Sequence, residues 1–147
     1  MTGLAPSMDR AEVLGRLNAG SSDTLMATLG IRYVDVGEDF LLATMPVGPA
    51  VHQPAGILHG GATAALAESV GSAASALRLN LEQQVPVGLE LSINHLRSVR
   101  EGLISARAEL VHGGRSTHLW DIRISDEQGR QVAWARLSMM ILDRRQP

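Results

Sequence analysis

The chain has 147 residues and a mass of 15.7 kDa, the size of one domain. Its 45% hydrophobic and 19% charged residues are typical of a folded globular protein, and a formal net charge of −2 predicts no attraction to nucleic acid or to an acidic membrane. The absence of cysteine excludes disulfides, thiolate metal sites and a cysteine nucleophile. All 13 positively charged residues are arginines, which excludes Schiff-base chemistry and a Walker-type phosphate loop, because both need lysine.

No segment is typical of a targeting signal. The first eight residues lack a basic stretch followed by an apolar one, so we expect no secretion and a cytoplasmic location. The longest stretch almost free of charge, Gly60 to Leu77, is rich in small residues and carries Glu68, which makes it too polar to span a membrane. We therefore expect no membrane partner. We expect one domain at residues 8–143, between short tails at residues 1–7 and 144–147.

The N-terminal part of the chain predicts two short helices. The first covers Asp9–Asn18, where Val13, Leu14 and Leu17 share one face. The second covers Asp23–Leu29, with Ser22 as its N-cap and Gly30 as its end.

A hairpin, a loop and one long helix are expected next. Strands are predicted at Ile31–Val36 and Phe40–Met45 around a turn at residues 37–39. Three prolines and a glycine predict a loop over Pro46–Pro54. The long helix follows over Gly60–Leu79, with an apolar stripe formed by Leu66, Val70, Ala73 and Leu77.

After Pro86 the hydrophobic pattern changes to the alternation of strands. Turn signals divide it into four strands that contain Val87–Ile93, Ile104–Leu110, Trp120–Ile124 and Ala133–Ile141. Consecutive strands joined by tight turns indicate an antiparallel sheet, and the single long helix must cover one of its faces. The predicted fold is α+β, with an antiparallel sheet wrapped around one long central helix.

Glu68 is the only ionisable side chain between Gly60 and Leu77, a stretch of 18 residues of which ten are glycine or alanine. It lies about 200° around the helix from Leu66. Its neighbours on that side are all small, namely Gly61, Ala64, Ser72 and Ser75. A solvated helix face would carry several long polar side chains, so the small residues predict that a second subunit covers this one. Glu68 is then either a structural carboxylate bonded across an interface or a catalytic acid, base or nucleophile.

The helix begins with two glycines after His59. Their N–H groups have no partner within the helix and, with the helix dipole behind them, are suited to bind a carbonyl oxygen that becomes negative. Glu68 lies eight residues beyond Gly60, about 12 Å along the helix axis. One substrate carbonyl could hardly touch both ends of that span, so the two groups serve different sites unless two subunits complement each other.

The residues around Glu68 resemble the hot-dog-fold acyl-CoA thioesterases. The similarity is to the branch with a glutamate on the helix, which includes 4-hydroxybenzoyl-CoA thioesterase and the enteric thioesterases of menaquinone and enterobactin synthesis. It rests on His59-Gly60-Gly61, Leu66-Ala67-Glu68-Ser69 and Gly71-Ser72, and extends to Ser22–Ile31, His52-Gln53-Pro54, Gly88-Leu89-Glu90, Asn94-His95 and Arg97–Gly102. It covers residues 8 to 142, essentially the whole domain.

The resemblance implies a role for each matching residue. Glu68 would be the nucleophile or general base, and Gly60 would donate its N–H to the thioester carbonyl. Gln53 and His59 would position the carbonyl and water, and Ser72, where some relatives have threonine, would orient the water. In the family the glutamate comes from the opposite subunit of a dimer, and two dimers form a homotetramer. No cofactor is implied, because CoA is part of the substrate.

Several polar residues are candidates for binding CoA. Arg97, Ser98 and Arg100 follow one predicted strand, and Arg115, Ser116 and Thr117 follow another turn, so both groups are candidates for phosphate contacts. Solvated turn residues are the alternative. Gly61 and His95 are further candidates for the substrate site, although a histidine on an apolar strand face is often a core residue. No metal motif and no Gly-x-Ser-x-Gly elbow occurs.

The leading hypothesis is therefore a thioesterase that acts on an acyl-CoA, or on an acyl carrier protein, with an aryl or a broader acyl group. A hot-dog dehydratase or hydratase is one alternative, but these enzymes rely on a histidine in a different local pattern. A non-catalytic acyl-CoA-binding protein is the other, and the presence of Glu68, Gln53 and Ser72 together speaks against it.

Overall fold

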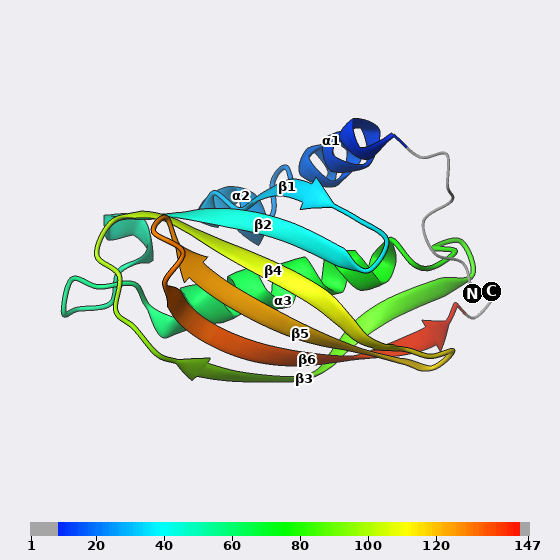
Figure 1. Cartoon of the computed structure of the whole chain (residues 1–147). Coiled ribbons are helices and arrows are strands. Elements are labelled where there is room, and N and C mark those ends of the chain that lie inside the picture. Colours follow the sequence, from blue (N-terminus) through cyan, green and yellow to red (C-terminus); the bar gives the residue numbers. More distant parts are fainter. Residues whose placement is uncertain (1–8, 145–147) are drawn as a thin grey trace.

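The computed structural model describes residues 9–144, so the expected tails lie outside the described residues except for Arg144. Six antiparallel strands form one sheet in the order β1-β2-β4-β5-β6-β3, and the long helix lies against its concave face (Figure 1). The helical elements are α1 (Arg10–Gly20), α2 (Leu25–Leu29), a 3₁₀ turn at Pro49–Val51 and α3 (Gly60–Ala76). The strands are β1 (Arg32–Val36), β2 (Phe40–Val47), β3 (Gln84–His95), β4 (Gly102–Gly113), β5 (Thr117–Asp126) and β6 (Gln131–Asp143). The predicted α+β fold is confirmed.

Small residues on the inner face of the sheet allow α3 to lie close to it. Ala43, Ala106 and Ala133 are fully buried and fall in one row across the sheet, in which Ile124 is the fourth member. On the helix, a Cβ added to Gly71 would lie 2.5 Å from Cδ2 of Leu137, so a larger residue at this crossing would displace the Leu137 side chain. The core is therefore the layer between α3 and strands β2, β4, β5 and β6.

The buried face of α3 differs from the predicted stripe. Its buried residues are Ala62, Thr63, Leu66, Ala67, Val70, Gly71, Ala74 and Ser75, whereas Ala73 and Leu77 are only partly buried. The prediction that a second subunit covers Ser75 is wrong, because the sheet curls around the C-terminal half of the helix and covers it within one chain. There the Ser75 hydroxyl accepts a hydrogen bond from Nε1 of Trp120 at 2.7 Å and contacts Nδ1 of His118 at 3.0 Å.

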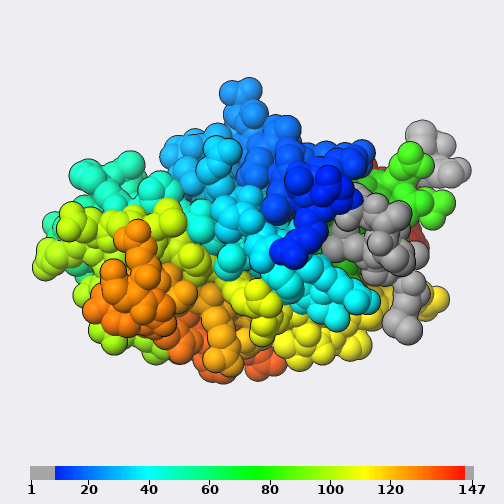
Figure 2. Space-filling model, turned by 45° about the horizontal axis from the view of Figure 1, so that its top comes forward, coloured from blue at the N-terminus to red at the C-terminus, as the bar shows by residue number. Residues whose placement is uncertain are grey.

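Polar side chains attach helix α1 to strand β1, and at the start of the helix Arg10 pairs with Asp35. The Asn18 amide donates to the Tyr33 carbonyl and accepts from the Tyr33 N–H, both at 2.9 Å. Val13 is buried beneath the helix, and Asp9 caps it by accepting from the N–H of Ala11 at 3.0 Å. In the space-filling view α1 lies on the surface, over the hairpin of β1 and β2 (Figure 2).

Two local predictions need correction. The N-cap of α2 is Thr24 and not Ser22, because residues 21–23 form a turn in which Asp23 has a φ of 57°. Gly30 does end this helix, with a φ of 70°. The loop expected from Pro46 begins later, because β2 continues to Val47 and pairs with β4. Strand β1 ends opposite Thr44, so only one edge of β2 is paired at Pro46, which is where a sheet tolerates proline.

Strand β3 lies at an edge of the sheet and has only β6 as a neighbour. None of its 12 residues is buried in the single chain. Its register with β6 shifts between Gly88 and Glu90, which makes Leu89 the extra residue of a β-bulge. No helix within residues 9–144 is long and apolar enough to cross a membrane.

Candidate active site

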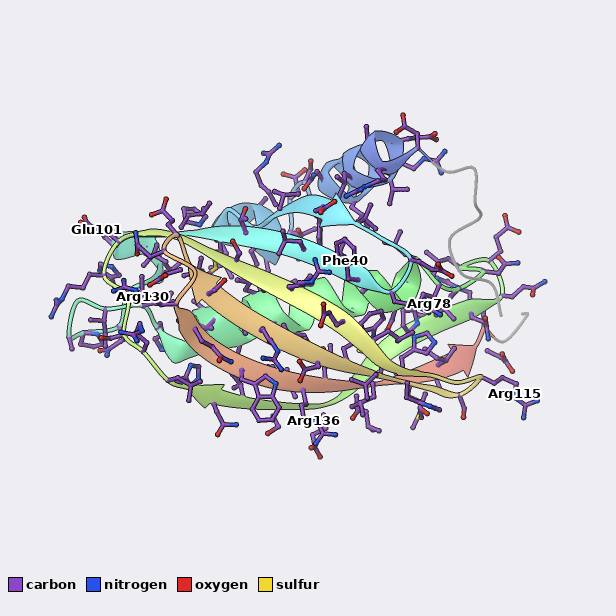
Figure 3. The ribbon with its side chains drawn as sticks, viewed as in Figure 1. Phe40, Arg78, Glu101, Arg115, Arg130 and Arg136 are labelled. Carbon is purple, nitrogen blue, oxygen red and sulfur yellow. The ribbon has the colours of Figure 1, made fainter. Side chains whose placement is uncertain are left out.

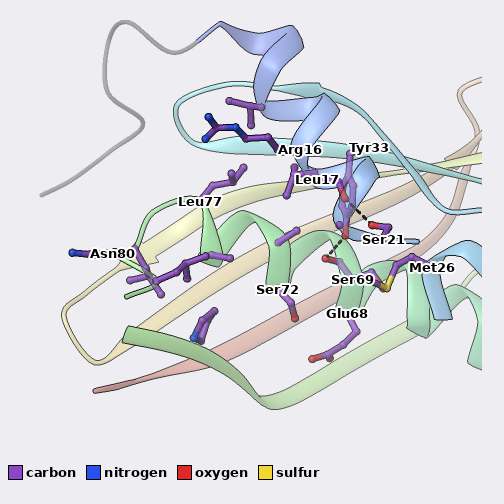
Figure 4. A pocket seen from close by; sticks show the side chains of 17 residues that line it. Arg16, Leu17, Ser21, Met26, Tyr33, Glu68, Ser69, Ser72, Leu77 and Asn80 are labelled. Atoms are coloured by element: carbon purple, nitrogen blue, oxygen red, sulfur yellow. Dashed lines mark hydrogen bonds between the residues drawn. The ribbon is translucent and has the colours of Figure 1, made fainter. Parts of the chain in front are cut away.

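Glu68 projects from the middle of α3 into a cavity of about 840 Å³ (Figure 4). It is the only carboxylate among the described residues that line this cavity. Ser72, one helical turn further on, lies in the same cavity, and its hydroxyl contacts Sδ of Met139 at 3.7 Å. The structure therefore places a carboxylate and a hydroxyl, one helical turn apart, in the lining of the same cavity.

Apolar side chains from several elements form the walls of the cavity. Its lining includes Val13, Leu17, Met26, Leu77, Leu79, Leu81 and Pro86, with Arg16 and Asn80 as polar members. Tyr33 also lines it and donates from its hydroxyl to the Ser69 carbonyl at 3.3 Å (Figure 4). Burial raises the pKa of Tyr33 to about 12, so the phenol stays neutral and keeps this proton. Such walls suit an apolar group, with Glu68 at the point where chemistry can occur.

The start of α3 provides a single unpartnered N–H group. Nδ1 of His59 caps the helix by accepting from the N–H of Gly61 at 2.8 Å, and the His59 carbonyl accepts from the N–H of Ala62 at 3.0 Å. Among the described residues the Gly60 N–H has no hydrogen-bond acceptor. Because the positive end of the helix dipole lies here, the Gly60 N–H is suited to bind a carbonyl oxygen.

Gln53 is held beside this helix start by a tight turn. Its Oε1 accepts from the N–H of Ala55 at 2.7 Å, so the side-chain amide is oriented with its NH₂ group available as a donor. The segment before β4 supports the same loop, since the N–H of Leu58 donates to the Val99 carbonyl at 2.8 Å. His52 adds a contact of 2.7 Å from Nε2 to the Arg100 carbonyl.

His95 lies directly over Gly60. A Cβ added to Gly60 would be 3.0 Å from Nε2 of His95, so the imidazole packs against the backbone that carries the unpartnered N–H. His95 is exposed at the end of β3, which shows that it is not a core histidine. The helix start, His59 and His95 thus form one group of polar atoms, and the loop that carries Gln53 leads into it.

Glu68 and the Gly60 N–H do not meet within one chain. They are eight residues apart on a continuous helix, about 12 Å along its axis. The cavity at Glu68 has no lining residue from the loop that holds Gln53 and His59. Glu68 and the Gly60 N–H therefore lie at two separate places on one chain.

The two groups of candidate phosphate ligands lie at opposite ends of the molecule. Ser98 and Arg100 line a polar hollow together with Glu101 and Arg130, and Arg97 precedes them on the same connection. The start of α3 lies at this end too, because Leu58 and His52, which precede the helix, contact the backbone carbonyls of Val99 and Arg100. Arg115, with Ser116 and Thr117, lies at the β4–β5 turn near the other end, as the labelled Arg115, Glu101 and Arg130 show (Figure 3).

Sequence reasoning missed the contribution of α1 and Tyr33 to the Glu68 cavity. Val13 and Leu17 were correctly placed on one face of a helix, but the periodicity cannot tell whether such a face packs on the core or lines a cavity. Here Val13, Arg16 and Leu17 line the cavity. No group of three or more His, Asp or Glu side chains within residues 9–144 is arranged to hold a metal ion.

Comparison with known proteins identifies the family. A model described as the thioesterase superfamily matches residues 55–133. The proofreading thioesterase EntH of Cronobacter turicensis is 46% identical over 133 residues, which are 90% of this chain and 96% of that protein. A mutant thioesterase of Pseudomonas aeruginosa superposes with a TM-score of 0.90 at 41% identity, covering 98% of this chain and 100% of the other. A thioesterase of Haemophilus influenzae superposes with a TM-score of 0.87 at 38% identity, covering 97% of this chain and 96% of the other.

The fold is thus that of a hot-dog thioester hydrolase. The chain belongs to the thioesterase superfamily and hydrolyses thioesters.

Proposed function

We propose that the chain is an acyl-CoA thioesterase in which Glu68 acts on the thioester carbonyl. The observation that carries this proposal is that, within residues 9–144, the only carboxylate lining the large apolar cavity is Glu68. The acyl group would lie in the cavity, and the Gly60 N–H would stabilise the negative charge that develops on the carbonyl oxygen. The reaction uses water and side chains of this protein, with no cofactor.

Two routes are compatible with this arrangement. Glu68 attacks the carbonyl carbon, the thiolate of CoA leaves, and water then hydrolyses the resulting anhydride. Alternatively, Glu68 takes a proton from water, which attacks the carbonyl directly. Ser72, one turn away, would orient the water in either route. A single turnover in water enriched in oxygen-18 distinguishes them, because only the anhydride route transfers the label to the enzyme.

The active unit in this proposal is a C₂ dimer. Glu68 and Gly60 of one chain lie about 12 Å apart along α3, so a complete site takes one residue from each of two chains. Strand β3 supports the dimer, because it is a 12-residue edge strand without a single buried residue and so offers a free edge for pairing. The resemblance extends this assembly to a tetramer of two dimers.

The dimer also accounts for both groups of phosphate ligands. Gln84, at the start of β3, lines a hollow together with Arg115, whereas His95, at the end of β3, lies against Gly60. Antiparallel pairing of two β3 strands would bring the Arg115 end of one chain towards the Gly60 end of the other. Arg97, Ser98 and Arg100 of one chain and Arg115, Ser116 and Thr117 of the other would then contact the CoA phosphates.

The acyl group that we propose is aryl, with longer acyl chains as the alternative. The cavity of about 840 Å³ has walls of aliphatic side chains and the Tyr33 ring, which accept either. Steady-state hydrolysis of benzoyl-, hydroxybenzoyl-, dihydroxynaphthoyl- and straight-chain acyl-CoA separates the two, and parallel assays with a carrier-protein thioester show whether CoA is the preferred thiol.

The catalytic assignment is tested by Glu68→Gln, which keeps the shape of the side chain and removes its charge. We expect kcat to fall on the order of 10²-fold or more, as for the loss of a general base. The variant should unfold at the temperature of the wild type. Hydrolysis at the wild-type rate by purified Glu68→Gln would contradict the assignment.

A further inference from the structure

The carboxylate of Glu68 lies against the backbone of Gly88, on the neighbouring strand β3. A Cβ added to Gly88 would be 2.3 Å from Oε1 of Glu68 and 3.4 Å from its Cδ. The first distance is far shorter than any contact between a carbon and an oxygen that are not bonded. The Glu68 carboxylate therefore occupies the space that the side chain of any other residue would take at this position.

The backbone conformation does not explain why residue 88 is glycine. Among residues 9–144 the glycines with a positive φ are Gly30, Gly56, Gly102 and Gly129, so Gly88 is not one of them. Glycine weakens a strand, since it loses more conformational freedom on folding than other residues and has no side chain to pack. The residue is exposed in the single chain, so no packing in the core of that chain restricts its size. Within one chain, the contact that requires glycine here is the close approach of Glu68.

The β-bulge provides the second half of the arrangement. The register between β3 and β6 shifts directly after Gly88, and bulges of this kind bend a strand and re-aim its neighbours. Gly88 and the bulge together form a shallow seat in β3, opposite the middle of α3. On the cavity side, Ser72 of the next helical turn lies near the same carboxylate (Figure 4).

We propose that Gly88 is a positioning residue for thioester hydrolysis, whose missing side chain sets where the Glu68 carboxylate lies. This inference rests on the proposed catalytic role of Glu68. A methyl group at residue 88 pushes the carboxylate from its seat by at least the overlap of the two atoms, which is of the order of 1 Å. A displacement of about 1 Å at a reacting group can reduce the rate about 10²-fold. Substrate binding depends on the cavity walls and the arginines, so KM should change little.

Gly88→Ala tests the seat directly, with Gly48→Ala as the matched control. Gly48 has an extended backbone with a φ of −169°, and a Cβ added there meets nothing within 4 Å. We expect kcat of Gly88→Ala to fall 10- to 100-fold, in line with the sensitivity of catalysis to such displacements. KM should stay within about twofold, and light scattering should show an unchanged oligomer. Gly48→Ala should behave as the wild type in every measurement. Full kcat in Gly88→Ala would overturn the inference.

A double-mutant cycle with Glu68→Asp separates a seat from a general strand defect. Aspartate is shorter by one methylene, about 1.5 Å, so its carboxylate does not reach the position of the added methyl group. Glu68→Asp alone should lower kcat, because its carboxylate stops short of the thioester. In the Glu68→Asp background, Gly88→Ala should cause little further loss, so the combined loss is close to that of Glu68→Asp alone and well below the product of the single losses. If the loss of kcat in the double variant equals the product of the single losses, residue 88 acts independently of Glu68, and the inference that Gly88 positions Glu68 is wrong.

The outcomes also separate this inference from the proposed function. If Glu68→Gln is inactive while Gly88→Ala is fully active, Glu68 is catalytic and only the seat is wrong. If Glu68→Gln is fully active, Glu68 is not catalytic, and the proposed positioning role of Gly88 is then wrong as well. If Gly88→Ala is insoluble, the double variant Gly88→Ala/Glu68→Asp decides. A soluble double variant would support a steric clash between the added methyl group and the Glu68 carboxylate. A double variant that is equally insoluble would overturn the inference.

Discussion

The imidazole of His59 and the N–H of Gly61 form a hydrogen bond of 2.8 Å, in which Nδ1 is the acceptor. The bond uses one of the free N–H groups at the start of α3 and leaves that of Gly60 without a partner. It also requires the ring proton to be on Nε2, which is then available as a donor. One side chain thus caps the helix and selects which backbone N–H is available to the substrate.

Two substitutions of His59 separate these effects. His59→Ala removes the cap, so we expect the free energy of unfolding to fall by about 1 kcal/mol. His59→Asn supplies another capping oxygen, so we expect stability close to that of the wild type. If Nε2 also contacts the thioester or water, both variants lose turnover although only one loses stability. Thermal unfolding and kcat measured on the same samples check this, and a fully stable His59→Ala would show that the cap contributes nothing.

Asn18 does not line the Glu68 cavity, but it should hold in place helix α1, which forms part of the cavity wall. Asn18→Ala removes two hydrogen bonds to the Tyr33 backbone, each of which contributes about 1 kcal/mol. We expect faster hydrogen exchange in α1 and a higher KM, because Val13 and Leu17 of this helix line the cavity. Hydrogen exchange followed by mass spectrometry reports on the helix directly. Asn18→Asp keeps the acceptor for the Tyr33 N–H but turns a carboxylate oxygen towards the Tyr33 carbonyl, so it should also speed exchange in α1. Unchanged exchange in Asn18→Ala would contradict the prediction.

The parts of the fold that depend on local pattern were predictable from the sequence. Alternation identified β4, β5 and β6, and the motif around Glu68 placed it on the long helix beside Ser72. The buried face of α3 was misjudged at Ser75, because its burial depends on how far the sheet curls around the helix end, and periodicity does not contain that information. The contact between Glu68 and Gly88 depends on the register of β3 against α3 and on a bulge. A glycine within an alternating strand is the only signal of such a contact in the sequence.

His118 should make stability depend on pH. Burial lowers its pKa below the usual 6.5, with smaller contributions from the charges of Arg78 and His112. The unfolded chain then binds the proton more tightly than the folded one, so stability is fully present above about pH 6.5 and is lost as the pH falls below it. We expect the melting temperature to decrease between about pH 7 and 5, and to decrease less in His118→Gln.

Asp126 titrates at lower pH than His118, so it should not obscure the pH dependence that His118 causes. Burial alone would raise its pKa, but hydrogen bonds and the charge of Arg130, with the N–H of Gln128, lower it below 3.8. Its contribution is therefore present throughout the range in which His118 titrates, and is lost only at more acidic pH. Identical pH profiles for the wild type and His118→Gln would contradict the role of His118.

Mixing two inactive variants tests whether two chains share each active site. Glu68→Ala removes the carboxylate. Gly60→Pro removes the unpartnered N–H and also displaces the His95 imidazole, because an added Cβ lies 3.0 Å from its Nε2, so it disables the groups at the helix start. The helix itself is preserved, because proline is favoured at the first helical position and His59 already has the extended conformation, with φ −70° and ψ 128°, that a following proline requires.

After subunit exchange at equal concentrations, about half of the dimers contain one chain of each kind. In such a dimer one site combines both defects, and the other combines the intact Glu68 with the intact Gly60. Activity should therefore recover to about a quarter of the wild-type value, counted as one intact site of two in half of the dimers. Each variant alone, incubated under the same conditions, is the control. If each chain instead carried a complete site, every site in the mixture would hold one defect, and no activity would return.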